Sequence, residues 1–246
     1  MALPEIHDPR RCALFFDFDG TLADIAARPD EVHVPDETRA TLKQLSTALQ
    51  GAVAIISGRE IASVDHYLLP VQLAMSGVHG LTRRDASGNV HMHEFDPHGI
   101  EHVENRLADF VTANPGLLME RKKGAVTLHY RQRPELEGAS HEAMRGAIGG
   151  FDSIRFRPGK MVVEALAHQS DKGAAIESFL AEPPFFGRVP VFAGDDVTDE
   201  DGFALVNSRQ GFSIKVGGGE TQARYRASNT QELLSWLKDV LDKIRG

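Results

Sequence analysis

The chain has 246 residues with a formal net charge of -8, 41% hydrophobic and 25% charged residues, and one cysteine, Cys12. This composition predicts a globular protein of one or two domains, and it excludes a typical nucleic-acid binder, an internal disulfide and a cysteine zinc site. No apolar run approaches the ~18 residues of a membrane span and residues 1–11 lack a signal-peptide core, so we expect a cytoplasmic protein with no membrane or nucleic-acid partner.

Strand and helix patterns alternate at both ends of the chain. Apolar runs predict buried strands at residues 13–16, 52–56, 73–75 and 189–193. Helical spacing of apolar residues predicts helices at residues 36–49, 171–180 and 229–244. The middle of the chain instead shows strand patterns at 83–93 and 126–130 and helical patterns at 98–112 and 135–148. The fold class is therefore α/β, a Rossmann-like parallel-sheet core with an inserted α+β cap domain.

The predicted domains are discontinuous. Residues 1–80 and 166–246 form the core, and residues 81–165 form the cap. The chain contains no pattern that predicts its oligomeric state.

An aspartate motif, Phe-Asp-Phe-Asp-Gly-Thr at residues 16–21, directly follows the first predicted strand. Alternate residues of a strand point the same way, so Asp17 and Asp19 project together. Open α/β sheets bind ligands at the carboxyl ends of their strands. Gly20 allows the backbone to turn sharply away from the direction of the strand. Crowded carboxylates at this place favour a divalent cation over the alternative, a solvated turn.

A second acidic cluster, residues 194–201, follows the strand at 189–193. Asp195 and Asp196 come where that strand ends, and Asp199 can begin the next helix. Helix capping and a solvated face account for Glu200 and Asp201 but not for Asp195, which should share the crevice of Asp17. Several carboxylates with room for water suit Mg²⁺.

Two further side chains are expected at the same crevice. Ser57 follows the strand at residues 52–56 and can donate a hydrogen bond to a phosphoryl oxygen, although a serine there can equally cap a helix. Lys172 lies in the first turn of a predicted helix, where it brings a positive charge; the alternative is a surface lysine.

These four segments, in this order, resemble the haloacid dehalogenase (HAD) superfamily of phosphatases. The resemblance implies an Asp17 nucleophile that forms an aspartyl-phosphate, and an Asp19 that acts as acid and then as base. It implies that Ser57 and Lys172 hold the phosphoryl oxygens. It assigns the Mg²⁺ cofactor to the Asp17 carboxylate, the Asp19 backbone carbonyl and Asp195, with metal-bound waters oriented by Asp196 and Asp199.

The chain is also similar to the trehalose-6-phosphate phosphatases, in strings at residues 24–30, 34–35, 76–80, 83–85, 120–122, 128–131 and 171–175. The resemblance implies hydrolysis of the small molecule trehalose 6-phosphate, in trehalose biosynthesis. It implies substrate contacts by Gly20 and Arg59, and contacts from Glu120, Lys122 and Glu164 to hydroxyls of the distal glucose.

Some interpretations stay open at this point. Glu120 and Lys122 can instead form an exposed ion pair on one strand face, and His129 can belong to the core or to the site. Lys123 and residues 165–169 depart from the family pattern, which affects the geometry expected of the cap. The alternative functions are hydrolysis of sucrose phosphate or mannosyl-3-phosphoglycerate, or a non-catalytic module that senses sugar phosphates.

Overall fold

The structure, a computed structural model, describes residues 3–26, 28–167 and 171–246. It divides the chain into two compact units, Met1–His91 with Ser170–Gly246, and Met92–Gln169. Each unit has its own cluster of buried hydrophobic side chains. Residues 81–91, expected in the cap, lie in the first unit because the strands β4 (Thr82–Arg84) and β5 (Val90–Met92) extend its sheet.

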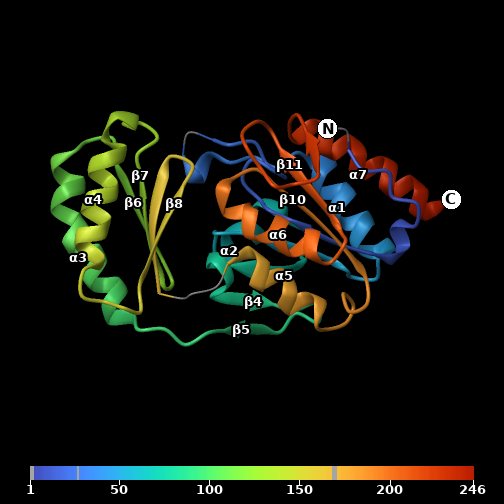
Figure 1. The fold of residues 1–246 in the computed structure, drawn as a ribbon, viewed down its shortest axis with the longest axis horizontal. Coiled ribbons are helices and arrows are strands. Elements are labelled where there is room, and N and C mark those ends of the chain that lie inside the picture. The colour runs from blue at the N-terminus through green and yellow to red at the C-terminus, as the bar shows by residue number, and fades with distance from the viewer. Residues whose placement is uncertain (1–2, 27, 168–170) are drawn as a thin grey trace. The chain divides into compact units, whose positions relative to one another are not determined.

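The first unit contains an eight-stranded sheet in the order β12-β11-β10-β1-β2-β3-β4-β5 (Figure 1). The pairs from β12 to β3 are parallel, and β4 runs antiparallel to β3. Every residue of the central strands β1 and β2 is buried, as their apolar runs predict for strands covered on both faces. The other strands have these bounds: β1 (Cys12–Phe16), β2 (Val53–Ile56), β3 (Ala74–Gly77), β10 (Val189–Gly194), β11 (Phe212–Val216) and β12 (Tyr225–Ala227).

Helices pack in pairs against this sheet. Phe15 of β1 stacks on Phe185, with ring centroids 5.4 Å apart, and lies 6.1 Å from Phe179 of α5. Phe192 of β10 lies 5.3 Å from Phe203 of α6. Because Phe15 and Phe192 are register partners, α5 and α6 cover the same face. Helices α1 and α7 pack against each other. The helices are α1 (Asp36–Ala48), α2 (Ile61–Leu68), α5 (Lys172–Leu180), α6 (Glu200–Ser208) and α7 (Thr230–Arg245).

The second unit is a four-stranded antiparallel sheet with two helices, as the α+β prediction requires. Its strand order is β6-β7-β9-β8, and Figure 1 shows α3 and α4 side by side along the strands. Apolar strand residues such as Val126 and Val163 share a buried cluster with Leu107 of α3 and Met144 of α4. The elements are α3 (Pro97–Ala113), α4 (Glu137–Ile148), β6 (Leu118–Lys122), β7 (Ala125–His129), β8 (Arg155–Gly159) and β9 (Val162–Leu166).

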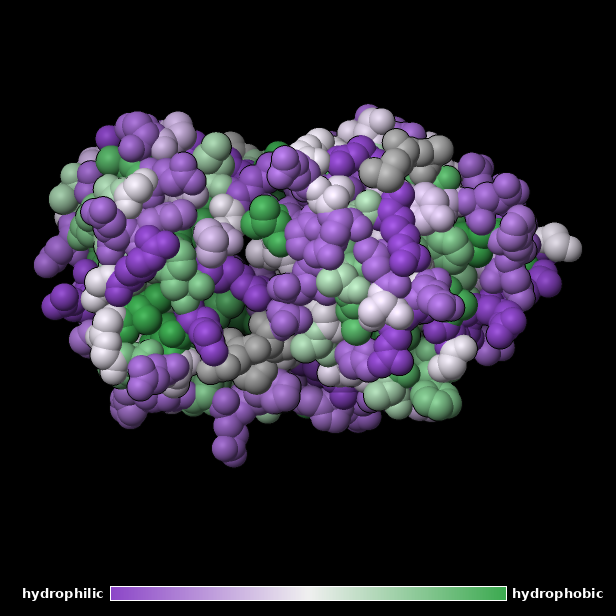
Figure 2. All heavy atoms as spheres, in the orientation of Figure 1, coloured by the Kyte–Doolittle hydropathy of each residue, from purple (hydrophilic) through white to green (hydrophobic). Residues whose placement is uncertain are grey.

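Short 3-10 helices connect some of these elements: η1 (Pro9–Arg11), η2 (Pro29–Glu31), η3 (Val78–Gly80), η4 (Pro134–Leu136) and η5 (Val197–Asp199). Figure 2 shows a largely hydrophilic surface on the face in view, with hydrophobic side chains in scattered patches. Among the described residues, no helix combines the length and hydropathy that crossing a membrane requires.

Candidate active site

Three predicted residues lie where neighbouring parallel strands end. Asp17 directly follows β1, Ser57 follows β2, and Asp195 follows β10, which are adjacent in the sheet. The backbone N–H of Asp17 donates to the carbonyl of Ala193 at 2.9 Å, and that of Ser57 donates to the carbonyl of Ser76 at 2.9 Å. The backbone hydrogen bonds between strands thus continue one residue past the ends of β1 and β2, and they fix the backbone from which the side chains of Asp17 and Ser57 project. All three residues are buried.

Lys172, the first residue of α5, occupies the centre of the cluster. Its Nζ lies 2.8 Å from Oδ1 of Asp17 and 2.6 Å from Oδ1 of Asp199. The residue is only 2% exposed, so the alternative of a surface lysine is wrong. Burial alone would lower the pKa of Lys172, but Asp17 and Asp199 outweigh it and raise that pKa, so the ammonium stays charged. Asp171 caps the helix by accepting from the N–H of Ala174 at 2.8 Å.

Three buried carboxylates surround this lysine. Asp17, Asp195 and Asp199 each offer one oxygen, and these oxygens lie within 4.8 Å of one another. Burial raises the pKa of Asp17 well above its usual range; Lys172 lowers that pKa, and Asp199 and Asp195 raise it further. Lys172 alone cannot neutralise three carboxylates, and a divalent cation would supply the missing positive charge. The oxygen-only donor set therefore fits a hard cation such as Mg²⁺.

Two glycines allow the carboxylates to approach so closely. Gly20 has φ +76°, and a Cβ placed there would lie 2.2 Å from Oδ2 of Asp195. A Cβ on Gly194 would lie 2.3 Å from Cγ of Asp199. Glycine is thus required at position 20 for two reasons: the backbone there is left-handed, and Asp195 leaves no room for a side chain.

Asp199 lies closer to the cluster than the sequence suggested. It was expected to orient metal-bound waters, yet its oxygen belongs to the group of three, while its Oδ2 accepts from the N–H of Asp196 at 2.8 Å. Asp196 caps η5. Glu200 and Asp201 lie in the first turn of α6, whose N-cap residue is Asp199.

Lys215 is a residue that sequence reasoning missed. It lies in β11, is buried, and its Nζ donates to the backbone carbonyl of Asp195. A lysine between the apolar residues Ile214 and Val216 is the signal that could have identified it, because buried lysines require a partner.

Asp19 and Arg59 form a two-point ion pair. The Nε and Nη2 atoms of Arg59 lie 2.7 and 2.8 Å from the two carboxylate oxygens of Asp19. The guanidinium carbon also lies 5.6 Å from the ring centre of Phe18 and 5.4 Å from that of Tyr67. The backbone N–H of Arg59 donates to Oγ of Ser57 at 3.1 Å. Arg59 therefore connects the serine with the second aspartate of the motif.

The residues expected to contact sugar lie together in the second unit. Nζ of Lys122 lies 3.2 Å from Oε1 of Glu164 and 3.9 Å from Oε2 of Glu120. Lys122 is 9% exposed, so the exposed-pair alternative does not describe it. Oγ1 of Thr127 donates to Oε1 of Glu164 at 2.7 Å, and Nε2 of His129 lies 3.0 Å from Oε2 of Glu120. His129 thus joins the polar cluster, and Thr127 was not anticipated.

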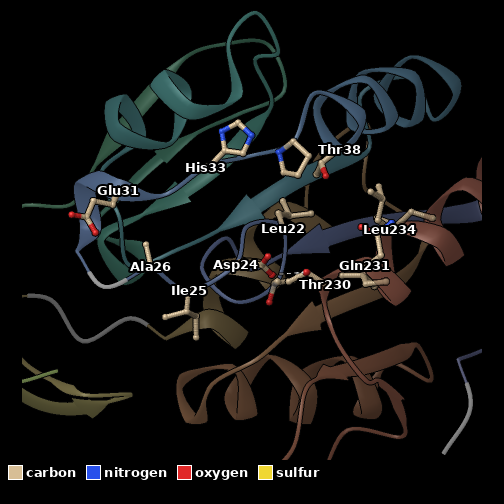
Figure 3. A pocket seen from close by; sticks show the side chains of 14 residues that line it. Leu22, Asp24, Ile25, Ala26, Glu31, His33, Thr38, Thr230, Gln231 and Leu234 are labelled. Atoms are coloured by element: carbon tan, nitrogen blue, oxygen red, sulfur yellow. Dashed lines mark hydrogen bonds between the residues drawn. The ribbon is translucent and has the colours of Figure 1, made fainter. Parts of the chain in front are cut away.

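A cavity of about 240 Å³ lies beside the segment that follows Gly20 (Figure 3). Leu22 and Leu234 are among its lining residues, and Oγ1 of Thr230 donates to Oδ1 of Asp24 at 2.7 Å. This bond ties the loop after β1 to the first turn of α7. Asp17 and Lys172 do not line the cavity, which is therefore distinct from the carboxylate cluster.

Known proteins share both sequence and fold with this chain. A family model described as trehalose-phosphatase matches residues 15–233. Trehalose-6-phosphate phosphatase of Escherichia coli is 41% identical over 228 residues, which cover 93% of this chain and 86% of that protein. The structure of the C-terminal domain of trehalose-6-phosphate phosphatase from C. albicans matches with TM-score 0.84 and 23% identity, over 95% of this chain and 92% of that one.

The predicted superfamily fold is confirmed by a more distant structure. A Bacteroides thetaiotaomicron member of the HAD enzyme superfamily matches with TM-score 0.64 and 13% identity, over 97% of this chain and 98% of that one. At this identity the likeness concerns the fold alone. The family match covers most of the sequence, and the chain belongs to the trehalose-phosphatase family, whose members are phosphoric monoester hydrolases.

Proposed function

We propose that this enzyme hydrolyses trehalose 6-phosphate to trehalose and inorganic phosphate, in trehalose biosynthesis, with Asp17 as the nucleophile and Mg²⁺ as cofactor. The observation that carries the proposal is the buried cluster of Asp17, Lys172, Asp195 and Asp199 at the ends of adjacent strands. The relative from Escherichia coli, named for this activity, supports the choice of substrate. The cytoplasm is the compartment we propose.

The first half of the reaction forms a covalent bond to the enzyme. A carboxylate oxygen of Asp17 attacks phosphorus, the bond between phosphorus and the sugar oxygen breaks, and Asp19 gives that oxygen a proton. Ser57 and Lys172 bind the phosphoryl oxygens, whose charge is spread in a loose transition state. Since Lys172 already contacts Asp17, attraction to its ammonium brings the phosphoryl group to the nucleophile.

The second half releases phosphate. Asp19 takes a proton from water, the water oxygen attacks phosphorus, and the bond to the Asp17 oxygen breaks, which regenerates the carboxylate. Asp19 is more exposed than Asp17, and it can therefore meet both the leaving sugar and water. Its pairing with Arg59 holds the side chain in one orientation between turnovers.

The cation would be held by the carboxylates of Asp17 and Asp195 and the backbone carbonyl of Asp19, with Asp196 and Asp199 orienting its waters. When bound, Mg²⁺ shields the nucleophile from the anionic ester and neutralises developing charge. The three buried carboxylates, which outnumber the neighbouring ammonium groups of Lys172 and Lys215, support this assignment.

The two regions have separate roles in this proposal. The first unit carries the phosphoryl chemistry, with Gly20 and Arg59 next to the substrate. The second unit recognises the sugar, and Glu120, Lys122 and Glu164 bind hydroxyls of the glucose that carries no phosphate. When a wrong sugar binds, these charged groups lose their hydrogen-bond partners, and the free-energy cost discriminates against that sugar.

The test is phosphate release from trehalose 6-phosphate, sucrose phosphate and mannosyl-3-phosphoglycerate, each with and without Mg²⁺. We expect turnover that requires Mg²⁺ and favours trehalose 6-phosphate. Similar rates on all three esters would contradict the proposal that trehalose 6-phosphate is the preferred substrate. The Asp17→Asn variant should fold and lose activity, and undiminished activity in that variant would reject the covalent mechanism.

A further inference from the structure

The sheet of the second unit has one apolar and one polar face. On the apolar face, strand residues share the buried cluster with α3 and α4. On the polar face, Glu120, Thr127 and Glu164 form a row across three strands, because Thr127 is the register partner of both glutamates. Lys122 and His129 flank this row on the same face, two residues along β6 and β7. Five polar side chains from three strands thus share one surface.

Within this surface, each glutamate has a hydrogen-bonding neighbour from β7 in addition to Lys122. Oγ1 of Thr127 donates to Glu164 at 2.7 Å, and the imidazole Nε2 of His129 lies 3.0 Å from Glu120. The lysine lies between the two carboxylates, at 3.2 Å from Glu164 and 3.9 Å from Glu120. Thr127 therefore contacts Glu164, and His129 contacts Glu120.

These neighbours limit how the glutamates can move. A glutamate side chain has several rotatable bonds, and ordering it on a ligand costs roughly 1–2 kcal/mol of rotamer entropy unless it is already fixed. Thr127 is β-branched and 1% exposed, so its hydroxyl is itself held in place. Side chains that bind a ligand work best when surrounding residues lock their rotamers.

We propose that Thr127 and His129 are positioning residues that set the preference for the disaccharide: Thr127 orients Glu164 and His129 orients Glu120 toward sugar hydroxyls. The inference rests on the proposed function and extends it to two residues to which that function assigns no role. The two effects differ in size, because the side chain of Glu164 is 7% exposed and that of Glu120 is 35% exposed. A hydrogen bond in the drier place contributes more.

The first experiment replaces Thr127. Thr127→Val keeps the shape and removes the hydroxyl, and we expect KM for trehalose 6-phosphate to rise about tenfold, as loss of a hydrogen bond to a charged group predicts. Thr127→Ser should restore KM, because the serine hydroxyl can donate to Glu164. The matched control is Thr112→Val on the exposed side of α3, whose hydroxyl donates only to a helix carbonyl.

The second experiment replaces His129. His129→Leu should raise KM about fivefold, less than Thr127→Val, because Glu120 is more exposed than Glu164. His129→Gln keeps a donor near Glu120 and should recover most of the loss. His98→Leu at the exposed start of α3 is the control. For all variants, inhibition by inorganic phosphate should match that of the wild type, because phosphate has no sugar hydroxyls.

The outcomes separate the inference from the function on which it rests. If the wild type favours trehalose 6-phosphate but Thr127→Val and His129→Leu leave KM within twofold, only the inference is overturned. If Thr127→Val also weakens inhibition by phosphate to the same degree, the threonine has a general structural role and the inference fails. A wild type that does not favour trehalose 6-phosphate overturns the proposed function, and this inference with it.

Discussion

Each unit of the protein contains one buried lysine between two carboxylates, and the surroundings of the two lysines differ. Lys172 lies 2.8 and 2.6 Å from its partners, with a third carboxylate, Asp195, in the same group. Lys122 lies 3.2 and 3.9 Å from its partners, which also contact the hydroxyl of Thr127 and the imidazole of His129. The two lysines therefore lie in different electrostatic surroundings.

The difference follows from charge. The three buried carboxylates of the first unit outnumber the neighbouring ammonium groups of Lys172 and Lys215, and a further cation would balance the charge. The cluster in the second unit contains hydroxyl and imidazole groups, which suits hydrogen bonding to a neutral polyol. Catalysis of phosphoryl transfer and recognition of sugar are thus expected to depend on the two lysines in separable ways.

The largest expected effect concerns turnover. Lys172→Met should lower kcat by about 10³-fold or more, because it removes a charge that stabilises the transition state. Lys122→Met should mainly raise KM for trehalose 6-phosphate, by roughly tenfold to a hundredfold, because it removes a contact to the sugar. Steady-state kinetics of both variants provide the measurement. Equal losses of kcat in the two variants would break the comparison.

The next effect concerns stability of the metal-free protein. Lys172→Met should lower the free energy of unfolding by about 3–5 kcal/mol, because it leaves two buried carboxylates without their cation. Lys122→Met should cost about 1–2 kcal/mol, because Glu164 keeps its bond from Thr127. Urea denaturation with a chelator measures both. Lys43→Met on the exposed side of α1 is the control and should change little.

A smaller effect separates backbone strain from crowding. Gly20 and Gly217 have nearly equal left-handed φ angles, +76° and +78°, but a Cβ meets Asp195 at the first and nothing within 4 Å at the second. Gly217→Ala should cost about 1 kcal/mol. Gly20→Ala should cost more and also abolish stabilisation by Mg²⁺, because Asp195 must move. Thermal unfolding with and without Mg²⁺ tests this, and identical behaviour of the two variants would show that Asp195 is not displaced.

A further effect is a pH dependence. The pKa of Asp17 is raised above its ordinary value of 3.8, mainly by burial, so the folded protein binds this proton more tightly than the unfolded chain. Its contribution is fully present below the ordinary pKa and is lost as the pH rises through the folded one. As the pH rises above the ordinary pKa of aspartate, metal-free wild type should therefore lose stability relative to Asp17→Asn.

The control for this prediction has the opposite sign. Hydrogen bonds, the largest from His91, lower the pKa of Asp85, so the carboxylate of that residue favours the folded state once it is ionised. Wild type should thus gain stability relative to Asp85→Asn as the pH rises through the ordinary range of aspartate. Denaturant titrations of both pairs at matched pH values measure the two slopes. Slopes of the same sign would contradict the assignment of Asp17 as a buried carboxyl group.

The sequence by itself determined the central strands and the positions at which they end. Uninterrupted apolar runs predict β1, β2 and β10, and a parallel sheet brings the carboxyl ends of such strands to one edge. The sequence alone therefore predicts that Asp17, Ser57 and Asp195 lie close together, since each directly follows one of these runs. The alternating strand of the cap likewise put Glu120 and Lys122 on one face.

Only the tertiary structure decided the partners. The pairing of Asp19 with Arg59 and the bond from Lys215 to Asp195 join residues from separate segments of the chain. The same is true of the bond between Thr127 and Glu164. Local spacing carries no information about such pairs, because it depends on register, side-chain rotamers and close approach at glycine. For that reason the apolar patterns predicted the location of the candidate site, and only the packed side chains showed which groups contact one another.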